Sequence, residues 1–90
     1  MNQFINGGYI LEVNIVKQSE FIYIEKIVIP NRKTAIYWIH SKKDANIILG
    51  EIKWFGAWRK YCFFPGENTI FDNKCLNFIL EFLEEVNGKK

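Results

Sequence analysis

The spacing of the apolar residues changes once along the chain, near residue 65, and this change limits the folds that are available. Before it, short segments either alternate, as in residues 9–16, or are apolar on both faces, as in residues 20–29, which indicates an outer and a central β-strand. After it, apolar residues recur every three or four positions, which indicates an amphipathic helix. Ninety residues are too few for a second core. We therefore predict one α+β domain over residues 1–90, an antiparallel β-meander of about five strands followed by one C-terminal helix packed on one sheet face.

Turn-forming residues divide the strand region into segments. Pro30-Asn31, Gly56-Ala57 and Pro65-Gly66 each interrupt an apolar run. The predicted strands are residues 9–16, 20–29, 34–41, 46–55 and 58–64. A glycine at position 56 fits the first position of a two-residue type II′ hairpin loop. That loop would place Lys53 directly opposite Lys60.

The helical segment has recognisable ends. Asp72 is a candidate N-cap and Gly88 a candidate C′ residue, so the predicted helix covers residues 72–87. We expect alanine at Leu80 or at Phe82 to open a cavity and cost about 2–5 kcal/mol. The apolar stripe is wider than one sheet face needs, so we also expect part of the helix to form a twofold homodimer interface. Its members are Cys75, Leu76, Phe78, Ile79, Leu80, Phe82, Leu83 and Val86.

Composition places the chain among globular proteins. Hydrophobic residues make up 49% and charged residues 24%, and no apolar run approaches the 18 residues that a membrane span needs. The N-terminal residues lack the basic and apolar regions of a signal peptide. We therefore expect a cytoplasmic protein that makes no membrane contact.

Side chains that carry out catalysis or bind metals are scarce. Cys62, Cys75 and His40 provide three nitrogen or sulfur ligands, whereas a structural zinc site needs four. The sequence contains neither a phosphate-binding glycine motif nor a nucleophile with an identifiable orienting group. We expect no catalytic residues, no metal and no cofactor, and we expect the protein not to be an enzyme.

Positive charge is segregated although the formal net charge is only +2. Residues 26–43 and 52–66 carry lysines and arginines with no acidic residue, whereas the helix carries Asp72, Glu81, Glu84 and Glu85 against one lysine, Lys74. Aromatic and basic residues alternate in the hairpin around Gly56. The predicted contacts there are Lys53, Phe55, Trp58 and Lys60, with Arg32, Lys33, Lys42 and Lys43 as outlying phosphate contacts.

Three interpretations of this hairpin remain open. Basic residues between aromatic rings suit single-stranded nucleic acid, since ammonium groups hold phosphates while bases stack on the rings. The same exposed tip also suits a host protein that the chain would bind and block. In the third interpretation the aromatic residues belong to the scaffold and the lysines are merely solvated.

The C-terminal part of the chain resembles a segment of small uncharacterised proteins of bacteriophages and other mobile elements. In these proteins the segment reads approximately G-x-I-K-W-[YF]-x-x-W-R-x-Y-x-F-F-P. The resemblance covers residues 49–83 and includes Gly50, Trp54, Trp58 and Arg59. It implies a phage-encoded protein in the host cytoplasm, and it implies no particular activity.

Overall fold

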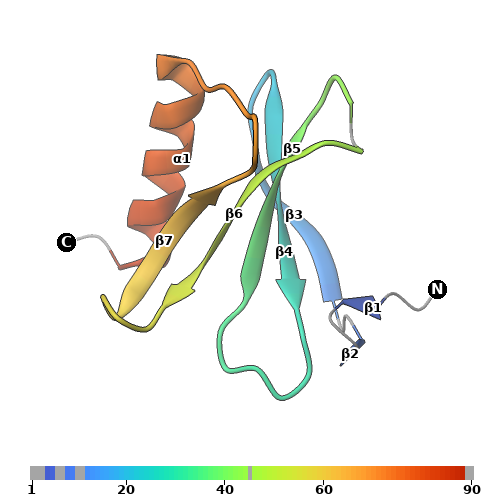
Figure 1. Cartoon of the computed structure of the whole chain (residues 1–90), viewed down its shortest axis with the longest axis vertical. Coiled ribbons are helices and arrows are strands. Elements are labelled where there is room, and N and C mark those ends of the chain that lie inside the picture. Colours follow the sequence, from blue (N-terminus) through green and yellow to red (C-terminus); the bar gives the residue numbers. More distant parts are fainter. Residues whose placement is uncertain (1–3, 6–7, 10–11, 45, 89–90) are drawn as a thin grey trace.

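The computed structural model describes residues 4–5, 8–9, 12–44 and 46–88, and it confirms the α+β meander. Five antiparallel strands lie in the order β3-β4-β5-β6-β7, and helix α1 packs on the sheet (Figure 1). The sheet strands are β3 (Glu12–Gln18), β4 (Ile22–Val28), β5 (Ile36–Ser41), β6 (Ile48–Phe55) and β7 (Lys60–Pro65). The helix α1 is Asn73–Val86.

The N-terminal part of the chain differs from the prediction. A small separate hairpin pairs β1 (Phe4–Ile5) with β2 (Gly8–Tyr9), so the first strand of the main sheet starts at Glu12 rather than at residue 9. A register shift after Ile15 then lets β3 continue to Gln18. Residues 10 and 11 of the predicted first strand lie outside the described residues.

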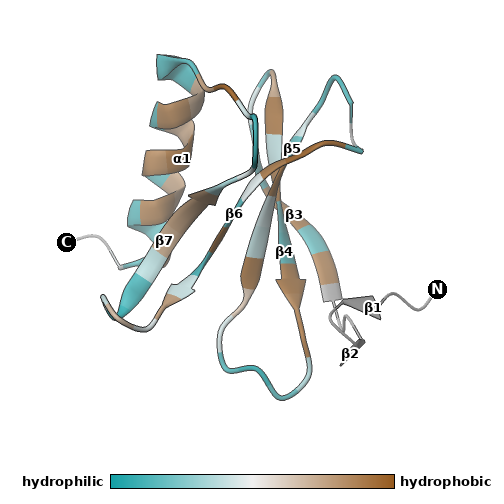
Figure 2. Cartoon of the chain, in the orientation of Figure 1, coloured by the Kyte–Doolittle hydropathy of each residue, from teal (hydrophilic) through white to brown (hydrophobic). Residues whose placement is uncertain are grey.

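The two faces of the sheet have different environments. On the helix side Ile24, Ile39 and Ile52 are fully buried, and they join Ile79 and Phe82 of α1 in one core. Figure 2 shows the matching pattern on α1, where hydrophobic and hydrophilic residues alternate around the helix. Ile15 of β3 lies on the opposite face, because it pairs with Glu25 and not with Ile24. Ile15 is consequently 56% exposed.

Both edge strands of the sheet reach the helix. Lys17 of β3 places its Nζ 2.6 Å from a carboxylate oxygen of Glu85. On the other edge, the Tyr61 N–H donates to the Asn87 side-chain oxygen at 2.8 Å, and the Asn87 side-chain nitrogen donates to the Tyr61 carbonyl at 3.0 Å. The sheet therefore curves around α1. No helix in the described ranges is long and apolar enough to cross a membrane.

The predicted helix ends are confirmed. The Asp72 carboxylate accepts a hydrogen bond from the Cys75 N–H at 2.9 Å, and Gly88 has a φ of 70° just beyond the helix. The burial of the stripe differs from the expectation at one position, because Leu80 is 50% exposed whereas Phe82 is buried. The predicted cavity therefore applies to Phe82 and not to Leu80.

Acid should weaken the start of the helix. The hydrogen bond from the Cys75 N–H holds the pKa of Asp72 below its ordinary value, so folding favours the charged carboxylate. This contribution is present above the unfolded pKa of about 3.9 and is lost as the pH falls through the lower folded value. We expect Asp72→Asn, which keeps an acceptor without a charge, to remove that part of the acid dependence. Thermal melts followed by circular dichroism from about pH 5 to pH 2 test this, and identical pH profiles would contradict it.

Candidate nucleic-acid interface

The hairpin that carries the predicted contacts has a longer turn than expected. Phe55 pairs with Lys60 and Lys53 pairs with Cys62, so residues 56–59 form a four-residue turn. Arg59 closes the turn with a φ of 55°, and its N–H donates to the Phe55 carbonyl at 2.9 Å. The predicted Lys53–Lys60 pairing is therefore wrong by two residues. A shift of two keeps the same side chains on each face, since side chains alternate with a period of two.

Lys53 and Phe55 lie on the sheet face that points away from α1, and their side chains have partners there. The Lys53 ammonium is 2.7 Å from a Glu51 carboxylate oxygen and 4.8 Å from the centre of the Phe64 ring. The Phe55 ring packs edge-on against Phe64 and Trp58. The positive charge of Lys53 is thus matched by an adjacent carboxylate.

The remaining predicted cations divide between the two ends of the sheet, because successive turns of a meander alternate between ends. Arg32 and Lys33 lie in the β4–β5 turn, at the same end as Trp58 and Lys60 (Figure 1). Lys42 and Lys43 lie in the β5–β6 turn at the other end. A six-residue strand rises roughly 20 Å, so the eight predicted residues do not form one surface.

Arg32 and Lys33 instead gather with a third cation, Lys26 of β4. They line a cavity of about 270 Å³, here called the basic hollow. Lys26 reaches it because it pairs with Tyr37 of β5 and so projects from the same face. Among the described residues, no carboxylate lines the hollow and no ion pair involves these three cations. Its lining residues are Lys26, Val28, Arg32, Lys33, Thr34, Ala35, Tyr37 and Tyr61.

Two tyrosine rings line the basic hollow, and Trp54 lies beside one of them. The Tyr61 ring is 6.0 Å from that of Tyr37 and 5.6 Å from that of Trp54, both in edge-on geometry. Trp54 is 40% exposed. Burial, and secondarily the neighbouring Tyr61, raises the pKa of Tyr37. The Tyr37 hydroxyl therefore stays protonated at neutral pH and keeps a hydrogen to donate.

The loop of the basic hollow is ordered by its own hydrogen bonds. Asn31 adopts a φ of 65°, which asparagine tolerates better than most residues, and the Arg32 N–H donates to the Ile29 carbonyl at 3.3 Å. The Arg32 Nε donates to the Thr34 carbonyl at 3.1 Å. A guanidinium carries five N–H donors, so four others are not used by that bond.

His40 takes part in a different arrangement on the far face of the sheet. Its Nε2 lies 2.8 Å from a carboxylate oxygen of Glu25, and its ring stacks on Tyr23 at 4.7 Å. His40 is buried. Within the described part of the chain no three His, Cys, Asp or Glu side chains come together as metal ligands would.

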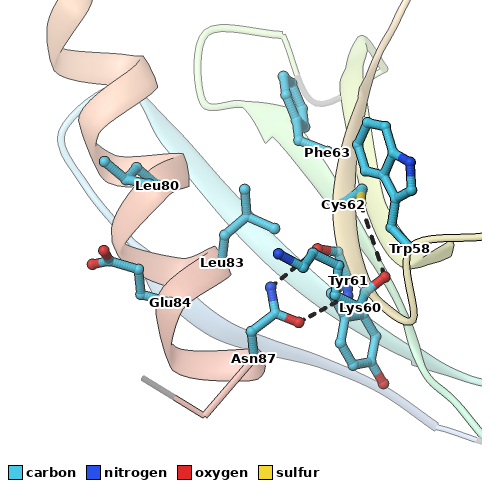
Figure 3. Close-up of a pocket in the computed structure, with 9 residues that line it drawn as sticks. All are labelled: Trp58, Lys60, Tyr61, Cys62, Phe63, Leu80, Leu83, Glu84 and Asn87. Carbon is cyan, nitrogen blue, oxygen red and sulfur yellow. Dashed lines mark hydrogen bonds between the residues drawn. The ribbon is translucent and has the colours of Figure 1, made fainter. Parts of the chain in front are cut away.

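A second cavity, here called the β7–α1 groove, measures about 500 Å³ and opens between β7 and the helix (Figure 3). Trp58 stands at the groove and is 67% exposed, and Tyr61 lines both this groove and the basic hollow. The groove is lined by Trp58, Lys60, Tyr61, Cys62, Phe63, Leu80, Leu83, Glu84 and Asn87.

The sequence predicted the cations of the basic hollow but not its aromatic residues. The run of cations from Lys26 to Lys33 is free of acids, and this indicated a basic region. The place of Tyr61 in the hollow, with Trp54 beside it, follows from the strand register, which the sequence pattern does not specify.

Comparisons with known proteins give a phage relative. The chain is 35% identical over 71 residues to the "Uncharacterized 9.3 kDa protein" of Acholeplasma phage L2, a match that spans 79% of this chain and 90% of the relative. No protein-family model matches the chain. No solved structure matches it either. The extent of the phage match establishes that this chain belongs to the family of the 9.3 kDa protein of Acholeplasma phage L2.

Proposed function

We propose that this member of a phage protein family is a non-catalytic nucleic-acid-binding protein that holds a single strand at the basic hollow. One observation carries the proposal. Lys26, Arg32 and Lys33 come from one strand and one turn to line a cavity that no described carboxylate lines. Grouped cations without neighbouring acids attract phosphate groups, and they do so even when the net charge of the protein is small.

The aromatic border favours a single strand over a duplex. The partly exposed Trp54 ring offers a surface on which an unpaired base can stack, whereas the bases of a duplex are stacked on one another. The protonated Tyr37 hydroxyl adds a neutral hydrogen-bond donor for a phosphate oxygen. Of the contacts expected from the sequence, Arg32 and Lys33 lie in this surface, and Trp58 and Lys60 lie at the same end of the sheet.

A matched pair of double variants tests the location. Arg32→Ser/Lys33→Ser and Lys42→Ser/Lys43→Ser remove the same charge from opposite ends of the sheet. Fluorescence anisotropy with a labelled oligo-dT strand should show that the first variant weakens binding and lowers the dependence of log K on log salt by about 1.4. The second variant should leave both nearly unchanged. Equal losses in the two variants would contradict a site at the basic hollow.

Trp54→Ala separates stacking from charge. We expect it to weaken oligo-dT binding by about 1–3 kcal/mol while the salt dependence stays the same, because a ring releases no counterions. A duplex of matching length should bind more weakly than the single strand.

The alternative function is to bind and block a host protein through the hairpin tip. The same binding experiments distinguish it from nucleic-acid binding. No change in anisotropy with any oligonucleotide at low salt would refute the nucleic-acid proposal. Nuclease-resistant, Trp58-dependent capture of a host protein would then favour the alternative.

A further inference from the structure

The β7–α1 groove has apolar walls that no described residue covers. Leu80 and Leu83 of α1 and Phe63 of β7 line it (Figure 3). Leu80 is half exposed, and Leu76, one turn earlier on the helix, is exposed to a similar extent. The groove shares Tyr61 with the basic hollow, but its apolar walls are not needed for the proposed nucleic-acid contacts.

The edge of β7 limits what can occupy the groove. A free strand edge normally offers backbone donors and acceptors to an added strand. Here the Asn87 side chain occupies both backbone groups of Tyr61, and Pro65 has no N–H. In an antiparallel pairing the outward groups fall on alternate residues, which leaves Phe63 between these two blocked positions. An extended peptide would therefore gain few ladder bonds, and the occupant must bind through side chains.

The groove of one copy of the chain is complementary to the same surface of a second copy. Trp58 lines one side of the groove, with its ring 5.1 Å from that of Phe55, and it is 67% exposed. Each copy of the chain therefore carries a large exposed apolar side chain beside an apolar groove. Lys60 lies on the strand wall and Glu84 on the helix wall, so two copies related by a twofold axis would bring opposite charges together. Protein interfaces characteristically centre on such an aromatic anchor in an apolar pocket.

We infer that the β7–α1 groove is a twofold interface that is filled by a second copy of this chain. Trp58 of each copy enters the groove of the other, Leu76 and Leu80 are covered, and Lys60 of one copy faces Glu84 of its partner. The wide apolar stripe of α1 then serves two purposes, since Ile79 and Phe82 fill the core while Leu76 and Leu80 fill the interface.

Sedimentation in the range of micromolar concentrations, without nucleic acid, tests the inference. The wild-type chain should sediment at twice its 10.7 kDa mass. Trp58→Glu and Leu80→Glu should each raise the dimer dissociation constant about tenfold or more. Ile15→Glu is the matched control, because Ile15 is similarly exposed but lies on the opposite edge strand. Circular dichroism confirms that each variant remains folded.

A charge exchange tests the orientation of the two copies. Lys60→Glu and Glu84→Lys should each weaken the dimer, and the double variant should recover a large part of the loss. A wild-type chain that stays monomeric at every concentration would overturn the inference, as would a dimer that Trp58→Glu and Leu80→Glu leave intact. The Arg32→Ser/Lys33→Ser variant should remain dimeric, because neither residue lines the groove. The sedimentation experiment can therefore refute the dimer without refuting nucleic-acid binding, and the anisotropy experiment can do the reverse.

Discussion

Replacing Phe82 with alanine is expected to lower the free energy of unfolding by about 3–5 kcal/mol. The Phe82 ring is 4% exposed, and it meets the Tyr37 ring edge-on at 4.9 Å. Phe82 packs between α1 and the sheet, and both edge strands of the sheet are bonded to the helix. The strands therefore have little freedom to move into the cavity that alanine would leave. Urea denaturation followed by circular dichroism measures the loss.

Leu80→Ala is the matched control for Phe82→Ala. Leu80 belongs to the same apolar stripe but is half exposed, so its truncation should cost only about 1 kcal/mol. Both variants should be measured at concentrations where the chain is monomeric, because a dimer would add to the effect at Leu80. Losses of similar size in the two variants would contradict the burial pattern of the helix.

Gly50→Ala is expected to lower the free energy of unfolding by about 1–3 kcal/mol, because the added methyl group overpacks the sheet. A Cβ at this position would lie 2.7 Å from the Phe63 Cε1 and 2.8 Å from the Phe64 carbonyl oxygen. The ring can turn aside, but the carbonyl belongs to the neighbouring strand. Strand β7 would have to move away from β6, which would also disturb the walls of the β7–α1 groove.

Gly56→Ala is the control for this substitution. A Cβ at Gly56 meets nothing within 4 Å in the described structure, so this variant should be as stable as the wild type. Thermal melts of the two variants test the difference. A Gly50→Ala protein with an unchanged melting temperature would show that β7 accommodates the methyl group without cost.

The local sequence determined the class of this fold. The five segments predicted as strands became five strands in chain order, and the segment with three- and four-residue spacing became the helix between Asp72 and Gly88. These features depend on neighbouring residues alone, since a strand or a helix exposes its apolar side according to its own period, and a cap acts within one turn.

Tertiary structure decided the strand register and the composition of the candidate site. A left-handed conformation at Arg59, a residue type that rarely adopts it, lengthened the hairpin turn and moved Lys53 away from Lys60.

The pairing of β4 with β5 brought Lys26 to Tyr37, and the packing of the sheet against α1 leaves Trp54 partly exposed rather than in the core cluster. The sequence pattern of the hairpin is compatible both with the predicted pairing of Lys53 with Lys60 and with the observed pairing of Lys53 with Cys62. It also does not specify which face of the sheet the helix covers. The choice between them depends on the packing of residues that are distant in the sequence, and for this reason the basic hollow and the β7–α1 groove became visible only in the folded chain.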